Sequence, residues 1–442
     1  VIDYSGGGGG AVERHAWDAV TTTGDGVLRV SGGELNIEGF NVVRNFEFTG
    51  GGIYGPGSLD IAVSGVWTNG NFETLSSGEE AVTVVSGAVL AISGSNNKQL
   101  RRPLVNDGII AWTGAQIGSS GSAVVTNNGL LLVSGGSDFF GAHTFVNNGM
   151  ITKITANTAS IGGSFGTFAN NGVVEALDGL LAINHTTITN YDDGILTGGT
   201  WRAAGGDLRI SKPSIVSLEG GATIERGTQD SEVLRDNGTP ALIQLQFIGD
   251  GNLILSPFVD AANTGPHLTL NGRINLGAGA VYDVQNSFTA TAGGVLETEI
   301  GPESQEGSEG VTGGRLEVGG VAMMDGVLRV RLAEGFAPSV GDAFMVAMGT
   351  DIDGEFHTVE TPPPPPGSQW VLEQTETEIR LIVTLVCPAD LAEPFGVLDL
   401  ADALSFVTAF TAMEPIADFD DNGLFDLADV LAFVNAFNAG CP

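Results

Sequence analysis

The chain has 442 residues, of which 67 are glycine and 42% are hydrophobic, and its net charge is −35 from 52 acidic and 17 basic residues. This length exceeds what one compact core usually holds, and the apolar fraction excludes a chain that is disordered throughout. Because nucleic acids and anionic membranes are bound through clustered basic residues, the acidic balance argues against both as partners. No apolar run approaches the roughly 20 residues of a membrane span.

Asn-Gly and Asp-Gly turns recur between residues 106 and 194. Their glycines are separated by 21, 20, 23 and 22 residues, at Gly108, Gly129, Gly149, Gly172 and Gly194. Each turn lies between two short apolar stretches, and a series of hairpins is one interpretation. The near-constant period instead favours one coil of a parallel β-helix per repeat. Stacked coils place like residues above like, about 4.8 Å apart, so we expect the Asn side chains to hydrogen-bond along the stack.

Looser glycine turns extend this pattern over roughly residues 20–285. The organisation resembles the passenger-type β-helices of large bacterial surface and autotransporter-like proteins. The resemblance implies a mainly β fold with a right-handed parallel β-helix, which we assign to residues 1–288, and it brings no catalytic motif. Residues 289–386 alternate apolar strands with turn sequences and predict a small β-sandwich or cap, because a last coil otherwise exposes a sheet edge.

Residues 387–442 contain ten acidic residues and no Lys or Arg. A unit of this size and charge should not fold without something positive to offset the repulsion. Residues 418–429 fit a twelve-residue calcium loop, with Gly423 at the sharp turn and the Leu424 carbonyl as a ligand. The side-chain ligands in this loop would be Asp418, Asp420, Asn422, Asp426 and Asp429. The alternative is an acidic helix N-cap with coincidental spacing.

The segment 399–410 repeats the segment 426–437 at an offset of 27, and each copy places an amphipathic helix after an acidic loop. This duplication resembles the dockerin module, in particular the Cys-flanked C-terminal form of planctomycete-type secreted proteins. The resemblance implies Ca²⁺ in both loops. The first loop offers Asp390, Asp399 and Asp402 but has one extra residue and Ala392 at an expected ligand position, so we expect a weaker or metal-free site there.

Apolar pairs precede the last ligand of each loop, at Leu400-Ala401 and Leu427-Ala428. In dockerins these positions help to recognise cohesin. Because the pairs are identical in the two copies, we expect the unit to bind a cohesin-like or cell-surface protein in two orientations.

The only two cysteines, Cys387 and Cys441, bracket this unit. An extracellular disulfide is one interpretation, and two free thiols in a cytosolic protein is the other. With the two resemblances, the first interpretation predicts a secreted or cell-surface protein.

The resulting functional prediction is a structural or adhesive β-helix that is anchored or assembled through its calcium module. The alternative is a polysaccharide lyase or glycoside hydrolase docked by the same module. No nucleophile-elbow motif is present, and the histidines show no metal-ligand spacing. The only adjacent basic pair, Arg101-Arg102, suggests a stabilised loop, and Trp112 and Trp201 suggest core packing more than sugar stacking.

Overall fold

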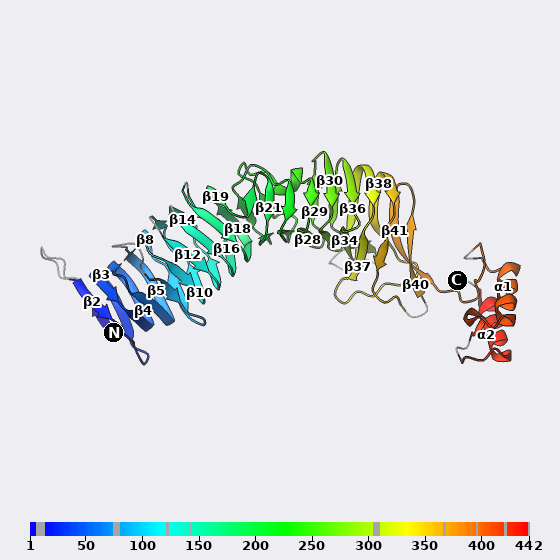
Figure 1. Cartoon of the computed structure of the whole chain (residues 1–442), viewed down its shortest axis with the longest axis horizontal. Helices are drawn as coiled ribbons and strands as arrows, with labels where there is room; N and C mark the ends of the chain where they lie inside the picture. The colour runs from blue at the N-terminus through cyan, green and yellow to red at the C-terminus, as the bar shows by residue number, and fades with distance from the viewer. Residues whose placement is uncertain are drawn as a thin grey trace.

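The computed structural model describes residues 1–5, 14–73, 80–120, 123–141, 143–163, 165–303, 310–365, 368–394, 397–419 and 422–440. The chain winds into a parallel β-solenoid of about 13 turns, and two α-helices follow it (Figure 1). The predicted mainly β fold and parallel β-helix are confirmed, and the parallel pairing excludes the series of hairpins.

One parallel ladder, here called the long ladder, runs along the whole solenoid. Its strands are β1 (Ile2–Tyr4), β3 (Val27–Glu38), β4 (Phe40–Tyr54), β5 (Ser58–Phe72), β7 (Val89–Ile92), β10 (Ile109–Trp112), β13 (Leu130–Val133), β16 (Met150–Ile161), β18 (Val173–Ile183), β22 (Thr200–Ala203), β25 (Thr223–Arg226), β28 (Asn252–Leu255), β31 (Arg273–Leu276), β34 (Val295–Pro302), β37 (Val327–Leu332) and β39 (Thr358–Glu360).

Two further ladders complete the coils of the first half. The one preceding the long ladder in each coil contains β6 (Val82–Val84), β9 (Leu104–Asn106), β12 (Val124–Asn127), β15 (Thr144–Asn147), β17 (Thr167–Asn170) and β19 (Thr187–Ile188). The one following it contains β2 (Arg14–Asp18), β8 (Lys98–Leu100), β11 (Ile117–Ser119), β14 (Asp138–Gly141), β23 (Asp207–Ile210) and β26 (Val233–Leu234), with the second halves of the longer strands.

A second sheet of twelve strands belongs to the later coils. Its strands are β20 (Tyr191–Asp192), β21 (Ile195–Thr197), β24 (Ser217–Glu219), β27 (Phe247–Ile248), β29 (Asp260–Asn263), β30 (His267–Leu270), β32 (Val281–Val284), β33 (Ser287–Ala290), β36 (Arg315–Met324), β38 (Ala343–Gly354), β40 (Ser368–Gln374) and β41 (Glu378–Leu385). The remaining elements are β35 (Val311–Gly313) and the helices η1 (Ala241–Gln244), α1 (Leu400–Thr411), η2 (Pro415–Ala417) and α2 (Leu427–Ala439).

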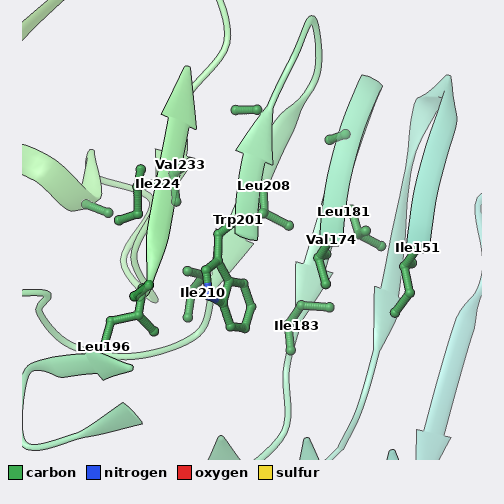
Figure 2. Packing of buried hydrophobic residues seen from close by; sticks show 14 of the residues in the cluster. Ile151, Val174, Leu181, Ile183, Leu196, Trp201, Leu208, Ile210, Ile224 and Val233 are labelled. Atoms are coloured by element: carbon green, nitrogen blue, oxygen red, sulfur yellow. The ribbon is translucent and has the colours of Figure 1, made fainter. Parts of the chain in front are cut away.

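Alternate side chains of each strand point inward and form one continuous apolar core. Val174, Trp201 and Ile224 are register partners on successive strands and all are fully buried (Figure 2). Trp112 is also buried, at 1% exposure. The tryptophans therefore pack the interior, as the sequence predicted, and neither is available to stack on a sugar.

The predicted asparagine stack is confirmed at the corner between the first two ladders of each coil. Asn106, Asn127, Asn147 and Asn170 point inward, and each Nδ2 donates to the next Oδ1, at 2.6, 2.8 and 2.8 Å. The Nδ2 of Asn147 also donates to a backbone carbonyl of the next coil at 3.0 Å. The inner stack thus satisfies buried polar groups that the corner would otherwise leave without partners.

A second stack lies directly outside the first. Its hydrogen bonds join the residues that follow each inner asparagine, at 2.7, 2.8 and 2.9 Å, and its members are Asp107, Asn128, Asn148 and Asn171. These side chains are exposed. These corners therefore hold two stacks of hydrogen-bonded side chains, an inner one that is buried and an outer one that is exposed to solvent.

The ladders cross the boundary predicted between residues 288 and 289 without a break. Parallel pairing continues from β34 to β37 and β39, and from β36 to β38. The antiparallel strands β41 and β40 then end the second sheet. Residues 289–386 thus contain the last coils of the solenoid and an antiparallel pair that covers its final edge.

Candidate functional site

The second acidic loop leads into α2 through a reciprocal cap. Asp426 is the N-cap residue, and its Oδ1 accepts the Ala428 N–H at 2.7 Å. Asp429, three residues on, accepts the Asp426 N–H at 2.9 Å through Oδ2 and the Phe419 N–H at 2.8 Å through Oδ1. The Asp426 carboxylate thus satisfies an N–H group of the first helical turn, and the Asp429 carboxylate satisfies those of the N-cap residue and of the loop. Asp429 is fully buried and ties the start of the loop to the start of the helix.

The turn of the same loop is closed by two predicted ligands. Asp418 accepts the N–H groups of Asn422 and Gly423, at 3.1 and 2.8 Å. Asn422 in turn accepts the Leu424 N–H at 2.7 Å. Gly423 has a φ of +76°, the left-handed conformation that a calcium loop requires at its sixth position.

The structure therefore brings Asp418, Asn422, Asp426 and Asp429 into one loop. Asp420 lies outside the described residues. Within the described ranges no three His, Cys, Asp or Glu side chains form a cluster that could hold a metal ion. The loop nonetheless offers carboxylate, amide and backbone carbonyl oxygens, which are the donors that calcium prefers, so the chemistry of these residues fits that ion.

The first loop repeats the cap. Asp399 is the N-cap residue of α1, and buried Asp402 accepts the Asp399 N–H at 2.9 Å and the Leu391 and Ala392 N–H groups at 2.7 and 2.8 Å. These bonds, above all that from Asp399, lower the pKa of the Asp402 carboxyl. Asp402 thus ties the residues that follow Asp390 to the start of α1, but the three predicted carboxylates do not form a cluster that could hold a metal ion.

The two loop–helix units share one apolar core, which is separate from the core of the solenoid. Phe406 of α1 and Phe433 of α2 stack with their ring centroids 4.0 Å apart and their planes 3° apart. All fourteen residues of this core form seven pairs at the repeat offset, which is 28 before the extra residue and 27 after it. The pairs are Ala389 with Ala417, Leu391 with Phe419, Leu398 with Phe425, Ala403 with Val430, Phe406 with Phe433, Ala409 with Ala436, and Phe410 with Phe437.

The same offset relates the exposed apolar side chains of the two helices. Leu400 and Leu427 are 73% and 70% exposed, as expected for the predicted partner-binding pairs, and Ala401 and Ala428 lie beside them. The sequence prediction missed two further pairs, Leu404 with Leu431 and Val407 with Val434. The signal was present, because these residues sit at identical places in the 27-residue repeat at spacings of one helical face.

Cys387 is disulfide-bonded. Cys441 lies outside the described residues, so the structure adds nothing on that half of the predicted bridge.

Outside the C-terminal module, the adjacent basic residues Arg101 and Arg102 bind loop residues, as predicted. Arg101 forms an ion pair with Glu73 at 2.6 Å, and buried Arg102 donates to the carbonyl oxygens of Glu80 and Gly57. The sequence prediction missed a buried histidine pair, His143 and His185, whose rings lie 4.8 Å apart. Burial lowers the pKa of His143 to about 4 and that of His185 to about 3.

Comparisons with known proteins give no relatives: no family model, no curated protein and no solved structure matches the chain. Within the part of the chain that the structure describes, no helix combines the length and apolar character needed to cross a membrane.

Proposed function

We propose that the protein is a secreted or cell-surface structural or adhesive β-solenoid that is attached to a partner protein through its two-helix, calcium-binding C-terminal module. The observation that carries this proposal is the duplicated outer face of the module. A face of equal shape and polarity occurs twice, once on each helix, although neither copy contributes to the shared core. Exposed apolar residues repeated in this way serve a contact and not folding.

Calcium would be held by Asp418, Asn422, Asp426, Asp429 and the Leu424 carbonyl. The ion would supply positive charge to a segment that carries ten acidic residues and no basic ones. Because loop 418–429 ends in the first turn of α2, its closure also orients Leu427 and the rest of the exposed face. The module would therefore be ordered, and bind its partner, in a calcium-dependent way.

The two related faces make a specific prediction about docking. The equivalent core residues Phe406 and Phe433 stack on each other, so each helix presents the same face on its own side of the module. A partner would bind either face. Leu404→Glu or Leu431→Glu alone would leave one face intact, whereas the double variant would abolish binding.

The test is capture of partner proteins from surface extracts by the full chain, in millimolar calcium and in chelator. We expect capture by the parent protein and both single variants in calcium, and by none of them in chelator. Ala439→Glu is the matched control, because Ala439 is exposed and lies at least about 80° around α2 from Leu427, Leu431 and Val434, and this variant should bind like the parent. Capture that survives the double variant, or that ignores the chelator, would refute the proposal.

A second candidate, a carbohydrate-active role, is favoured by a groove on the outer face of the second sheet. The groove is lined by Asp260, Asp283, Glu317 and Arg315, among others. Asp283 and Glu317 are register partners on neighbouring strands, which places their Cα atoms about 4.8 Å apart. Retaining glycosidases use carboxylates about 5–5.5 Å apart. Release of reducing ends from a polysaccharide panel, lost in Asp283→Asn, would establish this role in place of the structural one.

A further inference from the structure

Neighbouring strands of the long ladder present an uncharged, largely aliphatic surface to the outside. In β7, β10 and β13 the inward residues are buried, and the alternate ones point outward. We call the outward set the aliphatic face, and it consists of Val89, Ala91, Ile109, Ala111, Leu130 and Leu132. The outward positions of the flanking strands, Ser64 and Val66 on β5 and Met150 and Thr152 on β16, are also uncharged.

This surface is unusual for the chain that carries it. The protein has 52 acidic residues, yet ten consecutive outward positions on five strands hold none of them. Val89 and Ile109 are 39% and 37% exposed. Parallel sheets are normally covered on both faces, and contiguous apolar surface of this kind marks an interaction site.

Charges return on both sides of the aliphatic face, in the same column of register partners. On the N-terminal side are Arg29 and Glu47, which form an ion pair at 2.6 Å. On the C-terminal side are Glu175, Arg202 and Glu225, with Arg202 bound to both carboxylates at 3.3 and 2.8 Å. Along the column, one positive and one negative side chain therefore precede the uncharged positions, and a negative, a positive and a negative side chain follow them.

We propose that the aliphatic face is the interface of a dimer, in which a second copy of the chain packs face to face with its solenoid axis antiparallel. The two-fold axis would run along the strand direction, between β10 and β13. Each column of register partners in one copy then faces the same column of the other copy, with the order of the strands reversed. Ala111 faces Leu132, and Ile109 faces Leu130, so that a small residue meets a large one in one column and two aliphatic residues meet in the other.

The flanking charges favour a second copy of the chain in this antiparallel arrangement. In the same arrangement Glu47 faces Arg202 and Arg29 faces Glu225, so each end of the aliphatic face meets opposite charges. Shifting the axis by half a strand spacing would instead set Glu47 against Glu175. The one mismatch is Val66 opposite Glu175. Because Glu175 is already held within its own chain by Thr152 and Arg202, it needs no partner across the interface.

The size of the interface fits a reversible dimer. Ten strands at about 4.8 Å spacing span about 45 Å, and the two columns are about 7 Å apart, so each copy would bury on the order of 500 Å². The total of about 1,000 Å² lies at the lower limit for specific interfaces. We therefore expect a dimer that dissociates on dilution.

Sedimentation velocity of the full chain over a range of concentrations tests the association. The parent protein should pass from monomer to dimer, and Leu132→Lys, which places a charge at the centre of the interface, should remain monomeric. Val321→Lys is the matched control, since Val321 is 42% exposed on β36 of the second sheet, and it should dimerise like the parent. Circular dichroism would verify that both variants fold. A parent protein that is monomeric at every concentration, or equal dimerisation of Leu132→Lys, would overturn the proposal.

The orientation is tested separately with cysteines at Asn45 and Thr200, which face each other in the proposed register. A mixture of differently tagged Asn45→Cys and Thr200→Cys proteins should form a mixed disulfide, and neither variant alone should cross-link. Self-cross-linking of each variant without the mixed product would contradict the antiparallel arrangement. The dimer should persist in chelator, which distinguishes it from calcium-dependent docking of the module.

Discussion

Replacing Asn147 by alanine should destabilise the solenoid far more than the same change at its neighbour Asn148. Both side chains belong to asparagine stacks and both bond to the coils above and below, but Asn147 is fully buried and Asn148 is exposed. Asn147→Ala removes three hydrogen bonds, two to neighbouring asparagines and one to the Val173 carbonyl. At about 1 kcal/mol per bond, with the added cost of buried polar groups left without partners, the loss is about 3–4 kcal/mol.

Asn148→Ala removes two bonds of the same chemistry, at 2.8 and 2.9 Å, but water replaces them. Its cost should stay below about 1 kcal/mol. The assay is denaturant unfolding of both variants followed by circular dichroism, with the midpoints compared with that of the parent. Equal shifts in the two variants would refute the reasoning, because the expected difference comes from the burial of Asn147 and from its additional bond to the Val173 carbonyl.

Three further predictions follow from other contacts. His143 and His185 are buried in the neutral form, whereas histidine in the unfolded chain takes up a proton below about pH 6.5. The free energy of unfolding should therefore fall by about 1.4 kcal/mol per pH unit for each histidine as the pH is lowered from 6.5 to about 4. His185→Phe should flatten this pH dependence, which the unfolding midpoint reports. Gly149→Ala should cost about 1–3 kcal/mol, since its Cβ would collide with the Gly129 carbonyl oxygen of the preceding coil, and an unchanged unfolding midpoint would contradict this. Phe406→Ala, which removes a ring stacked at 4.0 Å, should cost about 3–5 kcal/mol and abolish the helical signal of the module; a module still folded after that change would show that the pair is not its core.

The coils that could be predicted from the sequence are those in which asparagines occupy the corner between two strands. Each asparagine must occupy the same place in every coil to bond its neighbours, so the period is visible in residues 106–194. Later coils keep the same backbone contact, but buried Leu270 stands at the inner asparagine position of the Gly272 corner. Val295 bonds to the carbonyl of Gly272, and Val327 bonds to that of Gly294, as Val173 bonds to that of Gly149.

The glycines of those later coils, Gly272, Gly294 and Gly326, are 22 and 32 residues apart. An insertion in the second interval conceals the period, which is why the sequence suggested a separate unit after residue 288. The buried histidines were missed for a related reason. They are 42 residues apart, and only the stacking of coils brings them together.

The C-terminal module could be predicted in more detail because its two copies keep the same spacing through the helices. The sequence predicted metal ligands at the carboxylates of both loops, with a helix N-cap only as the alternative for residues 418–429, whereas the structure shows a capping box at both helices. The extra residue in the first loop lies between the carboxylates and leaves the buried Asp402 in the same role as Asp429. What the sequence did not indicate is that every core residue has its counterpart in the other half.

The central claim, that the C-terminal module binds calcium, is tested most directly by calorimetric titration of the full chain with calcium. We predict saturable binding with a dissociation constant of about 10⁻³ M or tighter, lost in Asp418→Asn and retained in Glu414→Gln. The two substitutions remove the same charge, and Glu414 is an exposed residue outside the loop. No saturable heat at millimolar calcium, or equal binding by both variants, would contradict the account.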